Sequence, residues 1–118
     1  MSDADTKIET LREAMRNFVA ERDWQQFHTP KNLAMSLAIE AAELMEHFQW
    51  LDNAESAQVG KDPATLAAVG DELADVLCYA LSLANALDID VSHAVLNKLK
   101  KNSLKYPAER FRGRYRED

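Results

Sequence analysis

Residues 37–50, LAIEAAELMEHFQW, place a carboxylate in the middle of an apolar helix face. At helical spacing Glu40 falls between Leu33, Leu37 and Leu44, and Glu43 follows one turn later. An unpaired carboxylate is costly to bury. The position of Glu40 therefore needs an explanation.

Four segments have the apolar spacing of helices, and two of them begin with a capping residue followed by proline. Thr29-Pro30 and Asp62-Pro63 are typical N-cap and first helical positions, and Asp90 is a third candidate cap. Glycine and proline occur only three times each, which leaves little room for β-hairpins. The expected helices are residues 5–22, 30–48, 62–87 and 90–106, with a loop at 51–61.

Short connections between these helices predict an all-α, four-helix antiparallel bundle. The length of 118 residues predicts a single domain, residues 1–118, in which 107–118 form an irregular basic tail. The helices at 30–48 and 62–87 are more apolar than one such bundle can cover. We therefore expect an oligomer in which these helices also pack across subunits.

The remaining features of composition favour a cytoplasmic protein. The sequence has no apolar run long enough for a membrane span, and MSDADTKIET is polar and acidic, unlike a signal peptide. The single cysteine, Cys78, lies in an apolar run, so we interpret it as a small core residue in a reducing compartment.

Charge is distributed unequally along the chain. Residues 1–97 carry 6 Lys and Arg against 17 Asp and Glu, whereas residues 98–118 carry 8 against 3. An acidic body of this kind argues against nucleic acid as a partner. The two parts could be a solvated surface, or a divided site with acids for metal ions and basic residues for an anionic ligand.

Two pairs of acids repeat one spacing on the two most apolar helices. Glu40 and Glu43 are three residues apart, and so are Glu72 and Asp75 on the next long helix. In an antiparallel hairpin four carboxylates can converge, and they would repel one another without a cation between them. The pattern predicts a metal site, with surface acids beside the core as the alternative.

The ligand types indicate which metal. A di-iron bundle would carry Glu-x-x-His pairs, and this sequence has none. An all-oxygen site suits Mg²⁺, or Mn²⁺ in its place, bound together with substrate phosphates.

The helix at 90–106 carries Lys98, Lys101 and Lys105 on one stripe, with Asn102 beside them. These side chains, with the arginines of the tail, could hold phosphate oxygens, or they could be a solvated lysine face. Tyr79 lies on the same face as the acids and could contact a sugar or phosphate, or fill an interface. The aromatic residues at the two ends of the 30–48 helix are core residues or stack on a nucleobase: Trp24, Phe27, His28 and Trp50.

The combined motifs resemble the MazG-like all-α nucleoside triphosphate pyrophosphohydrolases. ERDWQQFHTPKNL, EAAELMEHFQW, DELADVLCYAL and KNSLKYP look closest to the dCTP pyrophosphatase branch, and the resemblance covers about residues 10–115. It implies Mg²⁺-dependent hydrolysis of a dNTP, dCTP or a modified dCTP, to dNMP and pyrophosphate in nucleotide-pool housekeeping. It also implies a homo-oligomer, with a tetramer favoured over a dimer and sites built between subunits.

The resemblance assigns roles to individual residues. It implies metal binding by Glu40, Glu43, Glu72 and Asp75, with Glu40 or Glu43 as the base that accepts a proton from the attacking water. It implies substrate contacts from Trp24, His28, Trp50, Tyr79, Lys98, Asn102, Lys105 and Tyr106. Met15 stands where close dCTP-specific relatives carry a histidine, which puts strict cytosine preference in doubt.

Two other interpretations remain open at this point. The chain could be a non-catalytic helical oligomerisation module with an acidic seam. It could also bind a metal ion or a nucleotide without hydrolysing it.

Overall fold

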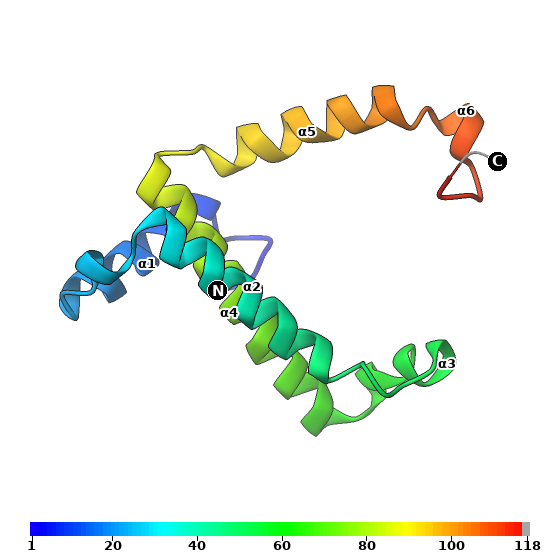
Figure 1. Ribbon diagram of the computed structural model, residues 1–118, viewed down its shortest axis with the longest axis horizontal. Helices are drawn as coiled ribbons and strands as arrows, with labels where there is room; N and C mark the ends of the chain where they lie inside the picture. Colours follow the sequence, from blue (N-terminus) through cyan, green and yellow to red (C-terminus); the bar gives the residue numbers. More distant parts are fainter. Residues whose placement is uncertain (117–118) are drawn as a thin grey trace. The chain divides into compact units, whose positions relative to one another are not determined.

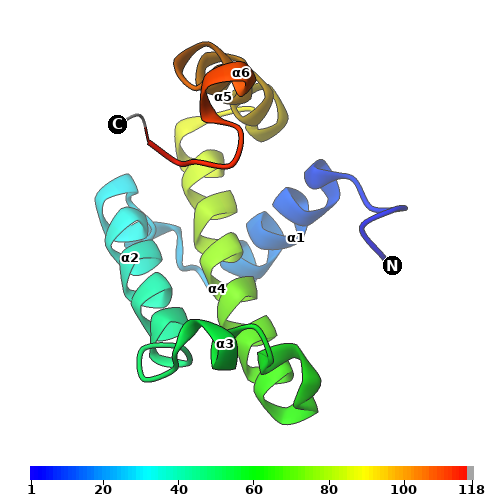
Figure 2. The ribbon, with the colours of Figure 1, turned by 90° about the vertical axis from the view of Figure 1, so that its right-hand side faces the viewer.

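A computed structural model describes residues 1–116, and every regular element in that range is helical (Figures 1 and 2). The long helices are α1 (Ile8–Glu21), α2 (Pro30–Glu46), α4 (Pro63–Leu87) and α5 (Val91–Lys105). The short elements are the 3₁₀ turns η1 (Gln25–Phe27) and η2 (Val59–Lys61) and the helices α3 (Asn53–Ser56) and α6 (Ala108–Phe111). The predicted all-α class is therefore confirmed.

The three predicted helix starts are confirmed by their cap geometry. The Thr29 hydroxyl accepts a hydrogen bond from the backbone N–H of Asn32 at 3.2 Å, and the Asp62 carboxylate accepts one from Thr65 at 3.2 Å. Asp90 caps α5 in the same way, accepting from the backbone N–H of His93 at 2.8 Å. Each side chain satisfies a donor that a helix start leaves without an intrahelical partner.

Two segments predicted to be irregular contain helical turns. The expected loop at 51–61 contains α3, which begins with a capping box. Asp52 accepts from the Glu55 backbone at 2.7 Å, and Glu55 accepts from the Asp52 backbone at 3.1 Å. The expected irregular tail contains α6, whose Phe111 ring contacts Tyr106 edge-on at 5.2 Å. Residues 117–118 of that tail lie outside the described residues.

Residues 1–88 form one compact unit built on α2 and α4. These two helices run antiparallel side by side, and α1 packs against α4 (Figures 1 and 2). The buried apolar side chains of the described residues are few: Val19, Leu33, Leu81 and Ala84. They fix the end of the α2–α4 pair where α1 also packs.

A polar pair joins α1 to α4 in this unit. Arg12 is only 6% exposed, and its Nε donates to Asn85 Oδ1 at 2.9 Å. Asn85 Nδ2 returns a hydrogen bond to the Arg12 carbonyl at 3.1 Å. Because both groups are satisfied in a place with little water, the pair sets where α1 lies on α4.

The second compact unit begins at Ile89 and contains α5 and α6. The antiparallel packing predicted for four helices is thus observed for α2 and α4, with α1 beside them. That α5 completes the bundle, and that 1–118 form one domain, stay predictions.

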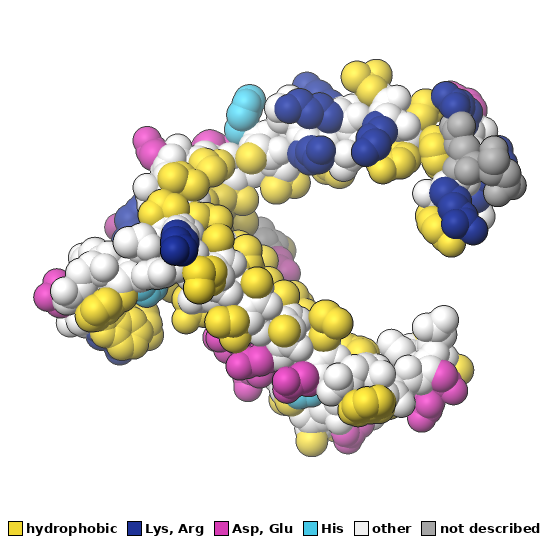
Figure 3. All heavy atoms as spheres, viewed as in Figure 1, with side chains coloured by type: hydrophobic (Ala, Val, Ile, Leu, Met, Phe, Trp, Pro, Cys, Tyr) yellow, Lys and Arg dark blue, Asp and Glu magenta, His cyan; other side chains and the backbone are white. Residues whose placement is uncertain are grey.

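Large apolar side chains remain exposed on α2 and α4, and Figure 3 shows them spread over this helix pair. Met35, Ile39, Met45, Leu73 and Leu77 are each about half exposed or more. Such a surface marks a place where something else packs.

Within residues 1–116, no helix combines the length and the apolar character that a membrane crossing needs.

Candidate metal centre and adjoining cavities

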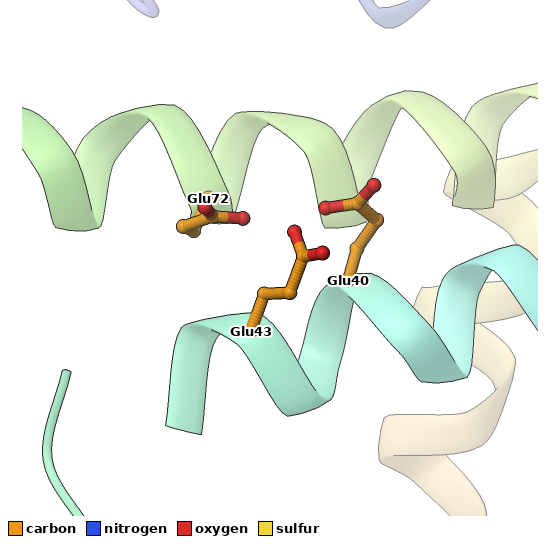
Figure 4. A group of neighbouring side chains, drawn as sticks. All are labelled: Glu40, Glu43 and Glu72. Carbon is orange, nitrogen blue, oxygen red and sulfur yellow. The ribbon is translucent and has the colours of Figure 1, made fainter. Parts of the chain in front are cut away.

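Three carboxylates meet between the antiparallel helices α2 and α4. Glu40 and Glu43 come from adjacent turns of α2 and Glu72 comes from α4, and Figure 4 shows their carboxyl groups turned toward one another. One oxygen from each lies within 4.8 Å of the other two. The i, i+3 spacing on one helix and the antiparallel partner therefore produce the convergence that the sequence predicts.

The crowding of these acids changes their protonation. The pKa of Glu40 is raised to about 7, first by a hydrogen bond with Glu43 that requires a proton, then by partial burial and neighbouring negative charge. The pKa of Glu72 is raised as well, chiefly by partial burial and then by the charge of Glu43. These acids repel one another when all are ionised, so a cation between them would stabilise their ionised form.

Two buried carboxylate oxygens of this group also lack hydrogen-bond partners. Oε2 of Glu40 and Oε2 of Glu72 are shielded from solvent and have no hydrogen-bond partner. Oxygens on opposite sides of Mg²⁺ lie about 4.2 Å apart, twice the Mg–O distance of about 2.1 Å. The three carboxylates thus fit a hard divalent cation after small side-chain rotations, and such a cation would satisfy both buried oxygens.

Asp75, the fourth predicted ligand, lies beside this group rather than in it. Its charge contributes to the raised pKa of Glu40, yet its oxygens are not among those within 4.8 Å of one another. Asp75 instead lines a neighbouring cavity of about 500 Å³. It therefore connects the acidic group to that cavity, which we call the aromatic cavity.

The aromatic cavity lies between α1, the η1 segment and α4. Its walls contain Phe18, Trp24, His28 and Tyr79, together with Met15 and Cys78. The rings follow one another: Phe18 and Trp24 meet edge-on at 5.8 Å, Trp24 and His28 stack at 6.5 Å, and His28 and Tyr79 lie 6.4 Å apart. A flat ring could be held here by stacking and apolar contact.

Cys78 differs from its predicted place in the core. It is half-buried and lines the aromatic cavity. Burial and the charge of Asp75 raise the pKa of its thiol, so the thiolate form is disfavoured. The side chain is a soft apolar wall rather than a nucleophile.

Trp50, another predicted substrate residue, is not among the residues that line this cavity. Trp50 follows α2 at its far end and is 87% exposed. Lys98, Asn102 and Lys105 lie on α5, and Tyr106 ends that helix with Lys105 Nζ over its ring at 5.3 Å. These four belong to the second unit, so their place beside the acids stays a prediction.

A second cavity, of about 420 Å³, shares Met15 and His28 with the aromatic cavity. Ser82 and Asn85 of α4 line it, and the sequence reasoning missed both. Ser82 follows Asp75 by seven residues and so falls on the same face of α4, which was a usable signal. Asn85 is placed by Arg12, 73 positions away, and no local pattern shows that contact.

The fold and the acidic group together define a small all-α protein with a candidate divalent-cation site between two antiparallel helices. Residues 35–117 match the family model described as the MazG-like family. The chain belongs to the MazG-like family.

Individual relatives carry a more specific name. The chain is 42% identical over 106 residues to dCTP pyrophosphatase 1 of Rattus norvegicus, a match that covers 90% of the chain and 62% of that protein. It is 44% identical over 101 residues to dCTP pyrophosphatase 1 of Homo sapiens, covering 86% of the chain and 59% of that protein. The chain thus spans about three fifths of the length of these relatives.

A solved structure matches nearly from end to end. A pyrophosphatase from Archaeoglobus fulgidus superposes with a TM-score of 0.80 at 40% identity, covering 91% of this chain and 98% of that one. This chain and that pyrophosphatase are therefore similar in fold as well as in sequence.

Proposed function

We propose that this protein is a Mg²⁺-dependent nucleoside triphosphate pyrophosphohydrolase that converts a dNTP to dNMP and pyrophosphate. The observation that carries the proposal is the group formed by Glu40, Glu43 and Glu72, with two buried oxygens that lack a partner. The dCTP pyrophosphatase names of the relatives support dCTP, or a modified dCTP, as the substrate. Mn²⁺ is expected to substitute for Mg²⁺ because it accepts the same oxygen ligands.

In the proposed reaction, the acids bind the metal ion and accept a proton. Mg²⁺ held by Glu40, Glu43, Glu72 and Asp75 would neutralise the triphosphate and acidify a nearby water molecule. Glu40 or Glu43 accepts the proton as that water attacks phosphorus in line.

The base of the nucleotide occupies the aromatic cavity in this proposal. Trp24, His28 and Tyr79 supply stacking surfaces, and Asp75 connects the cavity to the acids that would hold the phosphates. Lys98, Asn102, Lys105 and Tyr106 bind phosphate and sugar once α5 completes the bundle. These lysines would balance the negative charge that develops on the leaving pyrophosphate.

Trp50 contributes from a second copy of the chain. Trp24 and Trp50 flank α2, which has 17 residues and is about 25 Å long. The two indoles of one chain therefore cannot hold the same base, whereas an antiparallel neighbour would bring its Trp50 near this Trp24. The exposed apolar face of α2 and α4 supports such pairing, and we propose a homotetramer in preference to a dimer.

The proposed setting is the cytoplasm, where the substrate is made and consumed. Neither nucleic acid nor a membrane is an expected partner, as the acidic charge of residues 1–97 and the sequence pattern predict.

The test is to incubate the purified protein with each dNTP and NTP, in Mg²⁺ and in EDTA, and to separate the products by ion exchange. Glu40→Gln is compared with Glu46→Gln, because Glu46 is exposed on the same helix and outside the acidic group. Mg²⁺-dependent monophosphate and pyrophosphate, lost in Glu40→Gln and kept in Glu46→Gln, would support the proposal.

Other outcomes would contradict it. Nucleotide binding without product release would indicate a sensor. The absence of both binding and hydrolysis, with Glu40→Leu at least as stable as the parent, would indicate a non-catalytic module with an acidic seam.

A further inference from the structure

The C-terminal arm, which we define as residues 107–116, is a basic segment that the proposed reaction does not use. Every Lys or Arg position of α5 is a lysine, whereas those of the arm are all arginines: Arg110, Arg112, Arg114 and Arg116. Lysine acts as a point charge, but arginine holds paired N–H donors in one plane and binds phosphate through two hydrogen bonds. The change of residue type therefore favours an arm that binds an anion in a defined geometry.

The arm has a fixed turn directly after α6. The backbone N–H of Arg114 donates to the Phe111 carbonyl at 2.9 Å, which closes the turn. Its two central residues are Arg112, with φ −58° and ψ 119°, and Gly113, with φ +77°. These angles define a type II turn, whose third position needs the positive φ that glycine adopts without strain. The turn therefore places Arg112 and Arg114 on either side of one glycine.

Both of these arginines are available to an external anion. Arg112 and Arg114 are exposed, and neither forms an ion pair with any residue from 1 to 116. Nε of Arg114 donates to the Arg110 carbonyl at 2.8 Å, which orients the side chain and leaves both Nη groups to bind a ligand. Arg116 differs from them, because its guanidinium lies 5.5 Å from the centre of the Tyr115 ring.

The proposed reaction needs cations that residues 1–88 do not provide at its site. Within these residues, no Lys or Arg lines the aromatic cavity, and every charged group that shifts the pKa of Glu40 is an acid. A bound triphosphate would add further negative charge beside these acids, so it needs positive groups in addition to the metal ion. In this chain those groups have to come from residues 89–116.

We infer that Arg112 and Arg114 bind the terminal phosphates of the nucleotide, the part that leaves as pyrophosphate, and that Gly113 positions them. The inference rests on the proposed function, because it requires a triphosphate at the acids. It adds a second kind of contact to the α5 lysines. Paired hydrogen bonds from two guanidinium groups fix the orientation of the terminal phosphates as well as balancing their charge.

The test compares the full chain with arginine variants, using dCTP as substrate and pyrophosphate and dCMP as inhibitors, all with Mg²⁺. The measured quantities are KM for dCTP and Ki for each inhibitor. Arg112→Gln and Arg114→Gln should each raise KM for dCTP and Ki for pyrophosphate by about tenfold or more, the effect of losing one charge-assisted hydrogen bond. Neither should change Ki for dCMP, which lacks the terminal phosphates.

Two further variants test geometry rather than charge. Arg114→Lys keeps the charge but not the paired donors, so it should restore only part of the affinity for pyrophosphate. Gly113→Ala adds a methyl group that meets no atom within 4 Å, so it acts only through strain at φ +77°. It should raise KM for dCTP and Ki for pyrophosphate, by a smaller factor than the loss of either arginine.

Lys61→Gln is the matched control, because it removes one exposed positive charge outside the arm. It should leave KM and both Ki values unchanged. Arg112→Gln should unfold at the same temperature as the parent, since its side chain is exposed and has no ion pair.

The outcomes separate this inference from the proposed function. An unchanged Ki for pyrophosphate in both glutamine variants, with dCTP still hydrolysed, would overturn the role of the arm and leave the proposed function standing. Equal increases in Ki for pyrophosphate and for dCMP would also overturn it, because the arginines would then affect the whole site.

If the parent does not hydrolyse dCTP, the proposed function fails with dCTP as substrate. Calorimetric titration with pyrophosphate and Mg²⁺ then still tests the arm. Equal binding by the parent and by both glutamine variants, or no binding by the parent, would overturn the inference as well.

Discussion

The Arg12–Asn85 pair gives a quantitative test of how α1 is held against α4. Asn85→Ala removes the acceptor of the Arg12 Nε hydrogen bond at 2.9 Å and the donor to the Arg12 carbonyl at 3.1 Å. Arg12 is 6% exposed, so water cannot readily replace what the substitution removes. We expect the variant to be markedly less stable than the parent.

The magnitude follows from the two bonds. A hydrogen bond from a charged donor contributes about 1.5–3 kcal/mol, and a neutral one contributes about 0.5–1.5 kcal/mol. Together they predict that Asn85→Ala lowers the free energy of unfolding by about 2–4 kcal/mol. Asn53→Ala, at an exposed position in α3, should change it by less than about 0.5 kcal/mol.

Urea unfolding followed by circular dichroism measures this difference. All variants are compared at one protein concentration, because an oligomer gains stability with concentration. A loss in Asn85→Ala no larger than that in Asn53→Ala would refute the argument. It would mean that other contacts hold α1 in place and that the buried pair contributes little.

Three further predictions concern the acids and the core. In EDTA, the free energy of unfolding should decrease as pH rises from about 4.5 to about 7. The reason is that folded Glu40, with its pKa of about 7, retains a proton that the unfolded chain releases. Thermal unfolding at a series of pH values measures this, and Glu40→Gln should show a smaller decrease. Glu72→Gln should weaken Mg²⁺ or Mn²⁺ binding by tenfold or more in calorimetry, and unaltered affinity would exclude Glu72 as a ligand. Leu33→Ala, at a position only 2% exposed, should lower the free energy of unfolding by about 2–5 kcal/mol in urea, and a loss below about 1 kcal/mol would show that Leu33 is not a core anchor.

Local chemistry explains why the main helices could be predicted. A cap at Thr29, Asp62 or Asp90 acts within three residues, so a short stretch of sequence contains all its partners. The same applies to α3, whose D-x-x-E capping box from Asp52 to Glu55 was present in the predicted loop and overlooked.

The acidic group was predictable for a similar reason. Glu40 and Glu43 share a face through helical spacing alone, and one further assumption, an antiparallel partner, brings Glu72 to them. The oxygens of Asp75 lie outside the group of three, and its role as a fourth ligand stays a prediction. One helical turn decides whether a side chain points between two helices or beside them, and sequence spacing does not resolve that difference.

The cavities depended on contacts that no local pattern contains. Phe18 and Met15 reach the aromatic cavity only because α1 lies against α4, and the bond from Arg12 to a residue 73 positions away fixes α1 there. Once α1 is placed, the residues on one face of α4 can be assigned to the acidic group and to the cavities, which spacing alone does not show. The stripe from Glu72 to Ser82 changes along its length from carboxylates to an aromatic ring to a hydroxyl. In the proposed function the carboxylates hold the triphosphate and the aromatic cavity holds the base, so a nucleotide would lie along this face of α4.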